Sequence, residues 1–198
     1  MSVEIIPMAS FVLLTTFSPG PNNISSASMG VLYGYRQTRP YLLGIATGFF
    51  VIMAACALSA SFLLTWAPAS AEVLKWAGSL YVLWLALGML KAGYGISGGE
   101  GEPRAFAKGM LLQLVNPKAM IYGLTLYSTF LAPLAHRPGY LLGLGLVFAL
   151  TAFTAVSLWA LCGAAISARV ERPVVRRSVN SLLSLMLVYT AADLAGLV

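Results

Sequence analysis

The residues with the clearest chemical potential lie in two short runs, each inside a long apolar segment. Proline and glycine within a helix interrupt its hydrogen-bond ladder. In hydrocarbon such a break is tolerated only where it is buried in protein or lines a wet cavity. Both runs are therefore predicted to be helix breaks near the membrane midplane, where transporters place substrate sites. The runs are Ser18-Pro19-Gly20-Pro21-Asn22-Asn23 and Asn116-Pro117-Lys118.

Each run also has the composition of a helix start. Proline is favoured at the first helical position and Ser or Asn at the cap before it. The pairs Ser18-Pro19 and Asn116-Pro117 are each predicted to be a cap followed by a first residue. A helix N-terminus carries a partial positive charge and unpaired N–H groups. Two such ends facing one cavity would bind an anionic group such as a carboxylate.

Lys118 adds a full positive charge to the second run. It lies roughly 18 Å along the segment from its charged end, which is deep for a side chain that must reach water. An intramembrane lysine costs at least about 2.5–3.5 kcal/mol on insertion scales and marks a functional site by default. We expect it to bind a substrate carboxylate or to change charge during a transport cycle. The alternative is that its ammonium reaches a buried carbonyl or the membrane interface.

Further polar side chains accompany these runs. Gln113 and Lys118 flank the second break, and Tyr122 follows Lys118 by one helical turn on the same face. Asp193 is the one acid well inside a predicted span, and it is either a proton carrier, a partner for a substrate amine, or an acid at the interface. The predicted proton-coupling candidates are Asp193 and Lys118. The predicted substrate-binding residues are Ser18, Pro19, Gly20, Pro21, Asn22, Asn23, Gln113, Asn116, Pro117, Lys118 and Tyr122.

The amino-acid composition predicts that the chain is a polytopic membrane protein. Of 198 residues, 59% are apolar and 9% are charged, against roughly 25% charged in soluble domains. The predicted all-α fold has six transmembrane segments in a single domain over 1–198, with a loop at about 93–104. The chain has a single histidine, and its two cysteines lie inside apolar segments. We therefore predict no metal site, no disulfide and no cofactor. The segments run at about 4–35, 41–66, 73–92, 106–135, 138–168 and 178–198.

The basic residues gather at one side of the predicted membrane. Nine follow the odd-numbered segments and two follow the even-numbered ones. The orientation rule for membrane proteins explains this excess of positive charge, so we predict no nucleic-acid partner. It predicts that the nine are cytoplasmic and that both termini lie on the outer side of the cytoplasmic (inner) membrane. The nine are Arg36, Arg39, Lys91, Arg104, Lys108, Arg169, Arg172, Arg176 and Arg177; the two are Lys75 and Arg137.

The two broken segments occupy equivalent places in the two halves of the chain. Each is the first of three predicted segments, in repeats of about 1–95 and about 105–198. Because three crossings is an odd number, the second half enters the membrane from the opposite side, as an inverted repeat. Paired interrupted helices in such repeats indicate a midplane site. The spacings Gly30-x-x-x-Gly34 and Gly44-x-x-x-Gly48 further predict close helix packing.

These residues together resemble the LysE/RhtB family of amino-acid exporters, over essentially the whole chain. Within the family, the motifs most resemble those of the cysteine/O-acetylserine exporter branch. The resemblance implies efflux of amino acids driven by the proton gradient. Family members often carry an acidic residue after the second glycine of segment two; Phe49 stands there, which argues against a coupling role at that position. The motifs that carry the resemblance are the two breaks, Gly34-Tyr35-Arg36-Gln37, Gly44-x-x-x-Gly48-Phe49, 74–85, Tyr122-Gly123 and Ser128-Thr129-Phe130.

The predicted function is secondary-active export of small neutral amino acids or related metabolites, proton-coupled, by alternating access. The partners implied are a small-molecule amino-acid substrate and the lipid bilayer, and a homo-oligomer remains open. One alternative is an intramembrane enzyme, which would need a Ser/His pair, two apposed aspartates or a metal cluster. Another alternative is a passive channel or a structural subunit. In proteoliposomes a carrier shows saturation and trans-stimulation, whereas a channel shows neither.

Overall fold

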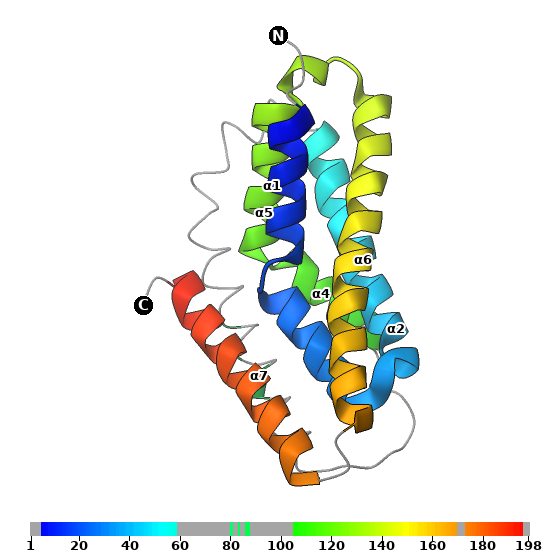
Figure 1. Cartoon of the computed structure of the whole chain (residues 1–198). Helices are drawn as coiled ribbons and strands as arrows, with labels where there is room; N and C mark the ends of the chain where they lie inside the picture. The colour runs from blue at the N-terminus through cyan, green and yellow to red at the C-terminus, as the bar shows by residue number, and fades with distance from the viewer. Residues whose placement is uncertain are drawn as a thin grey trace.

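The computed structural model describes residues 5–58, 80, 83, 86, 87, 105–169 and 173–195. Every regular element in these ranges is helical, which confirms the all-α prediction for them. The helices form an elongated bundle, with the chain running repeatedly between its two ends (Figure 1). The predicted third segment lies almost wholly outside the described residues, and the loop at 93–104 lies entirely outside them.

The first predicted break separates α1 (Ile5–Phe17) from α2 (Pro21–Leu58). The chain leaves α1 at Ser18, whose N–H donates to Leu14 O at 3.1 Å and whose Oγ donates to Thr15 O at 3.0 Å. The next helix begins at Pro21. The prediction that Ser18-Pro19 is its cap and first residue is therefore wrong by two positions, because Ser18 instead closes the preceding helix.

Helix α2 contains a sharp kink at Gly34, with φ 72° and ψ 166°. Below this kink the chain reverses and runs back beside its own first half (Figure 1), and the Tyr41 hydroxyl donates to Ser25 Oγ at 2.9 Å across the turn. A separate loop was expected here because Arg36 and Arg39 interrupt the apolar sequence. The structure replaces that loop with a single glycine-dependent reversal followed at once by helix.

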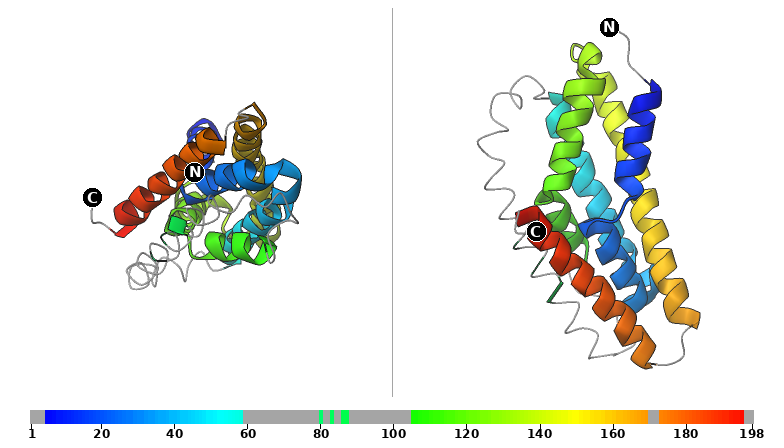
Figure 2. Two further views of the ribbon diagram at one scale, coloured as in Figure 1. Left: turned by 90° about the horizontal axis from the view of Figure 1, so that it is seen from below. Right: turned by 60° about the vertical axis from the view of Figure 1, so that its left-hand side comes forward.

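The second predicted break separates α4 (Ala105–Leu114) from α5 (Pro117–Thr125). Asn116 caps α5, with φ −79° and ψ 107°, and its Oδ1 accepts the N–H of Lys118 at 3.1 Å. The predicted cap and first residue are confirmed here. Helix α5 continues into the π-helix η1 (Leu126–Phe130) and the 3₁₀-helix η2 (Ala132–Leu134). The two broken crossings run in opposite directions and meet near their breaks (Figures 1 and 2).

Two further helices complete the described bundle, α6 (Pro138–Arg169) and α7 (Pro173–Ala195). Small residues hold α6 against the first half of α2: a Cβ at Gly30 would overlap the Ala160 backbone, and one at Gly163 would overlap Ala27. Close backbone approach of this kind is how helices associate in a bilayer. Gly34 has nothing within 4 Å of its Cβ direction, so the predicted packing role of this glycine is wrong.

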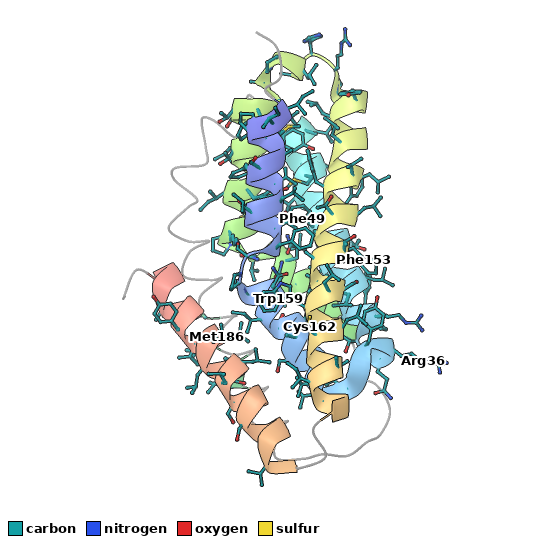
Figure 3. The ribbon with its side chains drawn as sticks, viewed as in Figure 1. Arg36, Phe49, Phe153, Trp159, Cys162 and Met186 are labelled. Atoms are coloured by element: carbon teal, nitrogen blue, oxygen red, sulfur yellow. The ribbon has the colours of Figure 1, made fainter. Side chains whose placement is uncertain are left out.

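The outer surface of the bundle is apolar along much of its length. Large hydrophobic side chains such as Leu14 on α1 and Leu150 on α6 are 74% and 58% exposed. Two described helices, α2 and α6, are long and apolar enough to cross a membrane. Figure 3 shows Arg36, which is exposed, pointing away from the bundle near the kink of α2.

Candidate functional site

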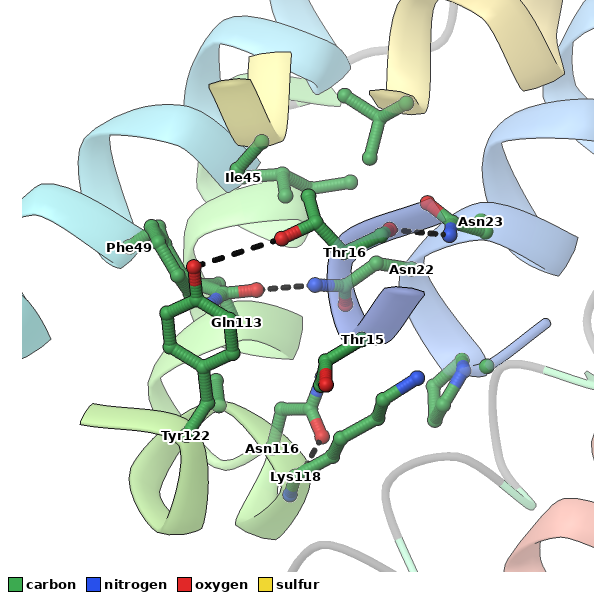
Figure 4. Close-up of a pocket in the computed structure, with 15 residues that line it drawn as sticks. Thr15, Thr16, Asn22, Asn23, Ile45, Phe49, Gln113, Asn116, Lys118 and Tyr122 are labelled. Atoms are coloured by element: carbon green, nitrogen blue, oxygen red, sulfur yellow. Dashed lines mark hydrogen bonds between the residues drawn. The ribbon is translucent and has the colours of Figure 1, made fainter. Parts of the chain in front are cut away.

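The two helix breaks lie on one cavity of about 50 Å³ (Figure 4). Eight of the eleven predicted substrate-binding residues line it, while Ser18, Pro19 and Pro117 do not. The structure therefore brings together side chains that are about 95 positions apart in the sequence. The lining residues are Thr15, Thr16, Gly20, Pro21, Asn22, Asn23, Ile45, Phe49, Gln113, Asn116, Lys118, Ala119, Tyr122, Ala152 and Val156.

Lys118 links the second break to the first. Its Nζ donates to Ser18 Oγ at 2.9 Å and to Pro19 O at 3.5 Å. The side chain also covers Gly20, where an added Cβ would come within 3.2 Å of the Lys118 Nζ. Both described hydrogen-bond partners are neutral oxygens, so they solvate the ammonium without cancelling its charge. An anion entering the cavity would meet an uncompensated attraction from this group.

A second link between the breaks leaves two polar atoms without partners. Asn22 Nδ2 donates to Gln113 Oε1, and the remaining Asn22 Oδ1 and Gln113 Nε2 are buried with no hydrogen-bond partner. Gln113 is 0% exposed. Exchanging O and N in both amides leaves the same result, one free acceptor and one free donor. Buried polar groups are nearly always satisfied, so this pair can bind a water or a ligand that brings both a donor and an acceptor.

Asn23 fixes the shape of the first break. Its Nδ2 donates to Thr16 O at 2.9 Å and to Ser18 O at 2.8 Å, which holds carbonyls that α1 can no longer use. Trp159 on α6 donates from Nε1 to Phe17 O at 3.2 Å. These bonds satisfy the backbone groups released at the break, as burial in a membrane requires. Asn23 is thus a structural residue of the site, whereas its neighbour Asn22 has an unpartnered Oδ1.

The two helix starts differ in what they offer to an anion. At α5 the Lys118 N–H is held by the cap, and the N–H groups of Ala119 and Met120 bond to Asn116 O at 3.0 and 3.3 Å. The prediction of free N–H groups is therefore wrong for α5. At α2 the described ladder begins with the Ile24 N–H to Gly20 O at 2.9 Å. The N–H groups of Asn22 and Asn23 precede this bond, at the helix end that carries the partial positive charge.

Aromatic side chains close the cavity on the side of α5. Tyr122 contacts Phe49 in an edge-to-face arrangement at 5.2 Å between ring centroids, and Phe11 at 5.4 Å. Phe11 also contacts Phe130 of η1 at 5.6 Å, which extends the cluster away from the cavity. The Thr16 hydroxyl reaches the Tyr122 hydroxyl at 3.5 Å. Tyr122 therefore presents a polar tip to the cavity and an apolar body to the cluster.

Seven of the lining residues were not predicted from the sequence. Thr15 and Thr16 precede the first break, and their polar groups were the signal that could have found them. The apolar lining residues have the composition of any buried helix face. Their position in the site could therefore be identified only from the three-dimensional structure. These residues are Thr15, Thr16, Ile45, Phe49, Ala119, Ala152 and Val156. The proton-coupling candidate Asp193 falls in α7, but its side chain lies outside the described part of the chain.

The bundle and its cavity, with a half-buried lysine between two helix breaks, have the features of a membrane transporter. Comparison with known proteins agrees. The family described as "LysE type translocator" matches residues 13–196. The chain belongs to this family, which is a membrane family. Its members are transporters, so the chain is not an enzyme.

Curated relatives are similar over nearly the full length. The "Cysteine/O-acetylserine efflux protein" of Escherichia coli strain K12 is 34% identical over 181 residues, covering 91% of this chain and 92% of the relative. The protein of the same name from Shigella flexneri has the same identity and coverage. That from Escherichia coli O139:H28 is 33% identical over the same shares. No solved structure matches the chain.

Proposed function

We propose that this chain exports small neutral amino acids or related metabolites across the cytoplasmic membrane, with cysteine- or O-acetylserine-like substrates favoured. The observation that carries the proposal is the cavity between the breaks, where Lys118 and the open amide pair meet. The names of the relatives favour the substrate class. A zwitterion has both groups that the cavity lacks, a carboxylate acceptor and an ammonium donor.

In this proposal each end of the zwitterion has its own partners. The carboxylate binds the Lys118 ammonium, the N–H groups at the start of α2 and the free Gln113 Nε2. The ammonium donates to the free Asn22 Oδ1. The two amide atoms have no partner within the described structure, and the Lys118 ammonium is bonded there only to neutral oxygens. The substrate therefore replaces weak or missing interactions with charge-assisted hydrogen bonds.

Transport would follow by alternating access around this fixed site. The aromatic cluster of Phe11, Tyr122 and Phe130 begins at the cavity with Tyr122 and extends away from it, and we propose this cluster as a gate. The antiparallel broken crossings support the six-helix inverted repeat as the architecture of the whole chain. Coupling to the proton gradient rests on Lys118, as a group that changes its charge state, and on Asp193 as a second candidate.

Replacement of Lys118 tests the proposal. Lys118→Ala, purified and reconstituted in proteoliposomes, should lose saturable counterflow of serine and cysteine at least tenfold, because the carboxylate loses its cationic partner at a cost of roughly 1.5–3 kcal/mol. Lys108→Ala, on the same broken crossing but outside the cavity, is the matched control and should keep exchange. Unchanged export by a well-expressed Lys118→Ala would remove this residue from the mechanism.

The same vesicles decide between a carrier and a passive channel. A carrier shows saturation, and substrate on the far side of the membrane accelerates uptake. Linear flux without trans-stimulation would contradict the proposed exporter. Measurements with and without an imposed pH gradient then test proton coupling separately from substrate binding.

A further inference from the structure

Four of the residues that line the cavity form an apolar wall. Ile45 and Phe49 project from α2, and Ala152 and Val156 project from α6. Each pair is spaced by four residues, so its two members lie on one helix face. All four are buried, with exposures of 0%, 6%, 7% and 2%. Figure 4 shows Ile45 and Phe49 on one side of the Asn22–Gln113 pair and Lys118 on the other.

The order of groups across the cavity matches the order of groups along an amino acid. The Lys118 ammonium comes first, and the amide pair of Asn22 and Gln113 follows. The hydroxyl pair of Thr16 and Tyr122 comes next, and Ile45 of the apolar wall comes last. In an amino acid the carboxylate is joined to the carbon that bears the ammonium, and the side chain leaves from that same carbon. A substrate whose carboxylate is at Lys118 would therefore direct its side chain toward the wall.

The composition of the wall restricts that side chain to neutral groups. Among the fifteen lining residues Lys118 is the one charged side chain, and it lies at the opposite end of the cavity. A charged substrate side chain at the wall would lose its hydration without gaining a partner, which is strongly unfavourable. A cavity of about 50 Å³ also leaves little spare room, since a single water needs roughly 10–15 Å³.

We propose that Ala152 and Val156 set the upper limit on the length of the transported side chain. They are small residues on one face of α6, so their volume decides how far the cavity extends toward this helix. Phe49 is engaged in ring packing with Tyr122 and has less freedom to serve as this limit. The inference rests on the proposed function and adds the residues that select among neutral substrates.

Two opposite changes test the inference. Val156→Ala deepens the cavity and should raise the ratio of methionine to serine exchange about tenfold, the effect of one or two methylene-sized groups in an apolar pocket. Ala152→Val shortens it and should lower the same ratio by a similar factor. The readout is counterflow in proteoliposomes with serine, cysteine, O-acetylserine, methionine and leucine as competing substrates.

Matched controls make the same chemical changes on the outer face of α6. Val147→Ala and Ala165→Val replace exposed residues that do not line the cavity, and both should leave the ratio unchanged. A uniform loss of exchange for all substrates, or an equal shift in the controls, would overturn the inference. If both cavity variants exchange substrate at the wild-type rate and with an unaltered ratio, the inference is overturned but the proposed function stands. Absence of any exchange by the wild type would overturn the proposed function as well.

Discussion

At the scale of single residues, the site depends on polar atoms that the fold leaves incompletely used. Lys118 bonds to two neutral oxygens, and Asn22 and Gln113 each bury one atom without a partner. Each buried unsatisfied polar atom costs about 1–3 kcal/mol. A chain that keeps these costs in an apolar bundle gains something from them, and substrate binding is the gain that we propose.

The amide pair gives a prediction at this scale. Gln113→Leu removes the free donor and should weaken the apparent affinity for serine about tenfold or more, because one hydrogen bond to the carboxylate is lost. Asn22→Leu should weaken it similarly by removing the acceptor for the ammonium. Because the two amides also bond to each other, the double variant should lose less than the sum of the two single losses.

The double-mutant cycle is measured as competition for counterflow, with thermal unfolding in detergent as a check on folding. Ser184→Ala is the control, since its buried hydroxyl also lacks a partner but does not line the cavity. We expect this variant to keep the wild-type affinity. Strictly additive losses from the two amide variants would contradict a jointly used pair.

The sequence predicted most of the polar residues that line the cavity, but not Thr15 and Thr16, and none of the four residues of its apolar wall. A lysine or glutamine inside an apolar segment is costly and therefore conspicuous, so Lys118 and Gln113 could be identified without a structure. Val156 and Ala152 have no such signal, because every helix of this chain carries residues of their kind. Only the packing of α6 against the breaks distinguishes the wall of the cavity from the surface that meets lipid.

At the scale of the helices, proline positions predicted both breaks, but not the residue at which each new helix begins. Asn116 caps α5 as expected, while α2 begins at Pro21 because Ser18 bonds back into α1. The kink in α2 was not predicted. The basic residues Arg36 and Arg39 indicated a loop, whereas Gly34 alone accomplishes the reversal with φ 72°.

Gly34 therefore gives a prediction about stability. Its φ and ψ of 72° and 166° lie in a region that is essentially restricted to glycine. Gly34→Ala should destabilise the fold by about 1–3 kcal/mol and lower the thermal unfolding midpoint in detergent. Gly143→Ala is the control, because Gly143 lies in helical backbone with nothing within 4 Å of an added Cβ.

The control should be neutral or stabilising by up to about 1 kcal/mol, since alanine is the better helix former. An unfolding midpoint of Gly34→Ala equal to that of the wild type would contradict the kinked geometry of α2. It would indicate instead that a longer, conventional loop joins the two halves of this helix.

At the scale of the whole molecule, the antiparallel broken crossings explain why one cavity can draw on both halves of the chain. Helix α1 and the first half of α2 descend through the bundle, while α4 and α5 ascend (Figure 1). Their breaks consequently meet at a similar depth, with Lys118 reaching from one to the other. Length and hydropathy predicted the crossings, but the contact between breaks depends on three-dimensional packing that spacing alone does not determine.

Orientation in the membrane gives the last prediction. The kinked end of α2, with exposed Gln37, and the connection between η2 and α6, with exposed His136, lie at opposite ends of the bundle (Figure 1). Nine basic residues follow the odd-numbered predicted segments and two follow the even-numbered ones. This bias predicts that the Gln37 end is cytoplasmic. The test uses single cysteines introduced after Cys56→Ala and Cys162→Ala, labelled in intact cells with a membrane-impermeant maleimide.

His136→Cys should be labelled in intact cells, and Gln37→Cys only after the membrane is opened. The parent without cysteines should show no labelling in either condition, which controls for reaction with other proteins. Labelling of Gln37→Cys from outside would reverse the orientation and make the aromatic cluster at Phe11 and Phe130 a cytoplasmic gate. An exporter needs its cavity to load from the cytoplasm, so the reversed orientation would also change which side of the site must open first.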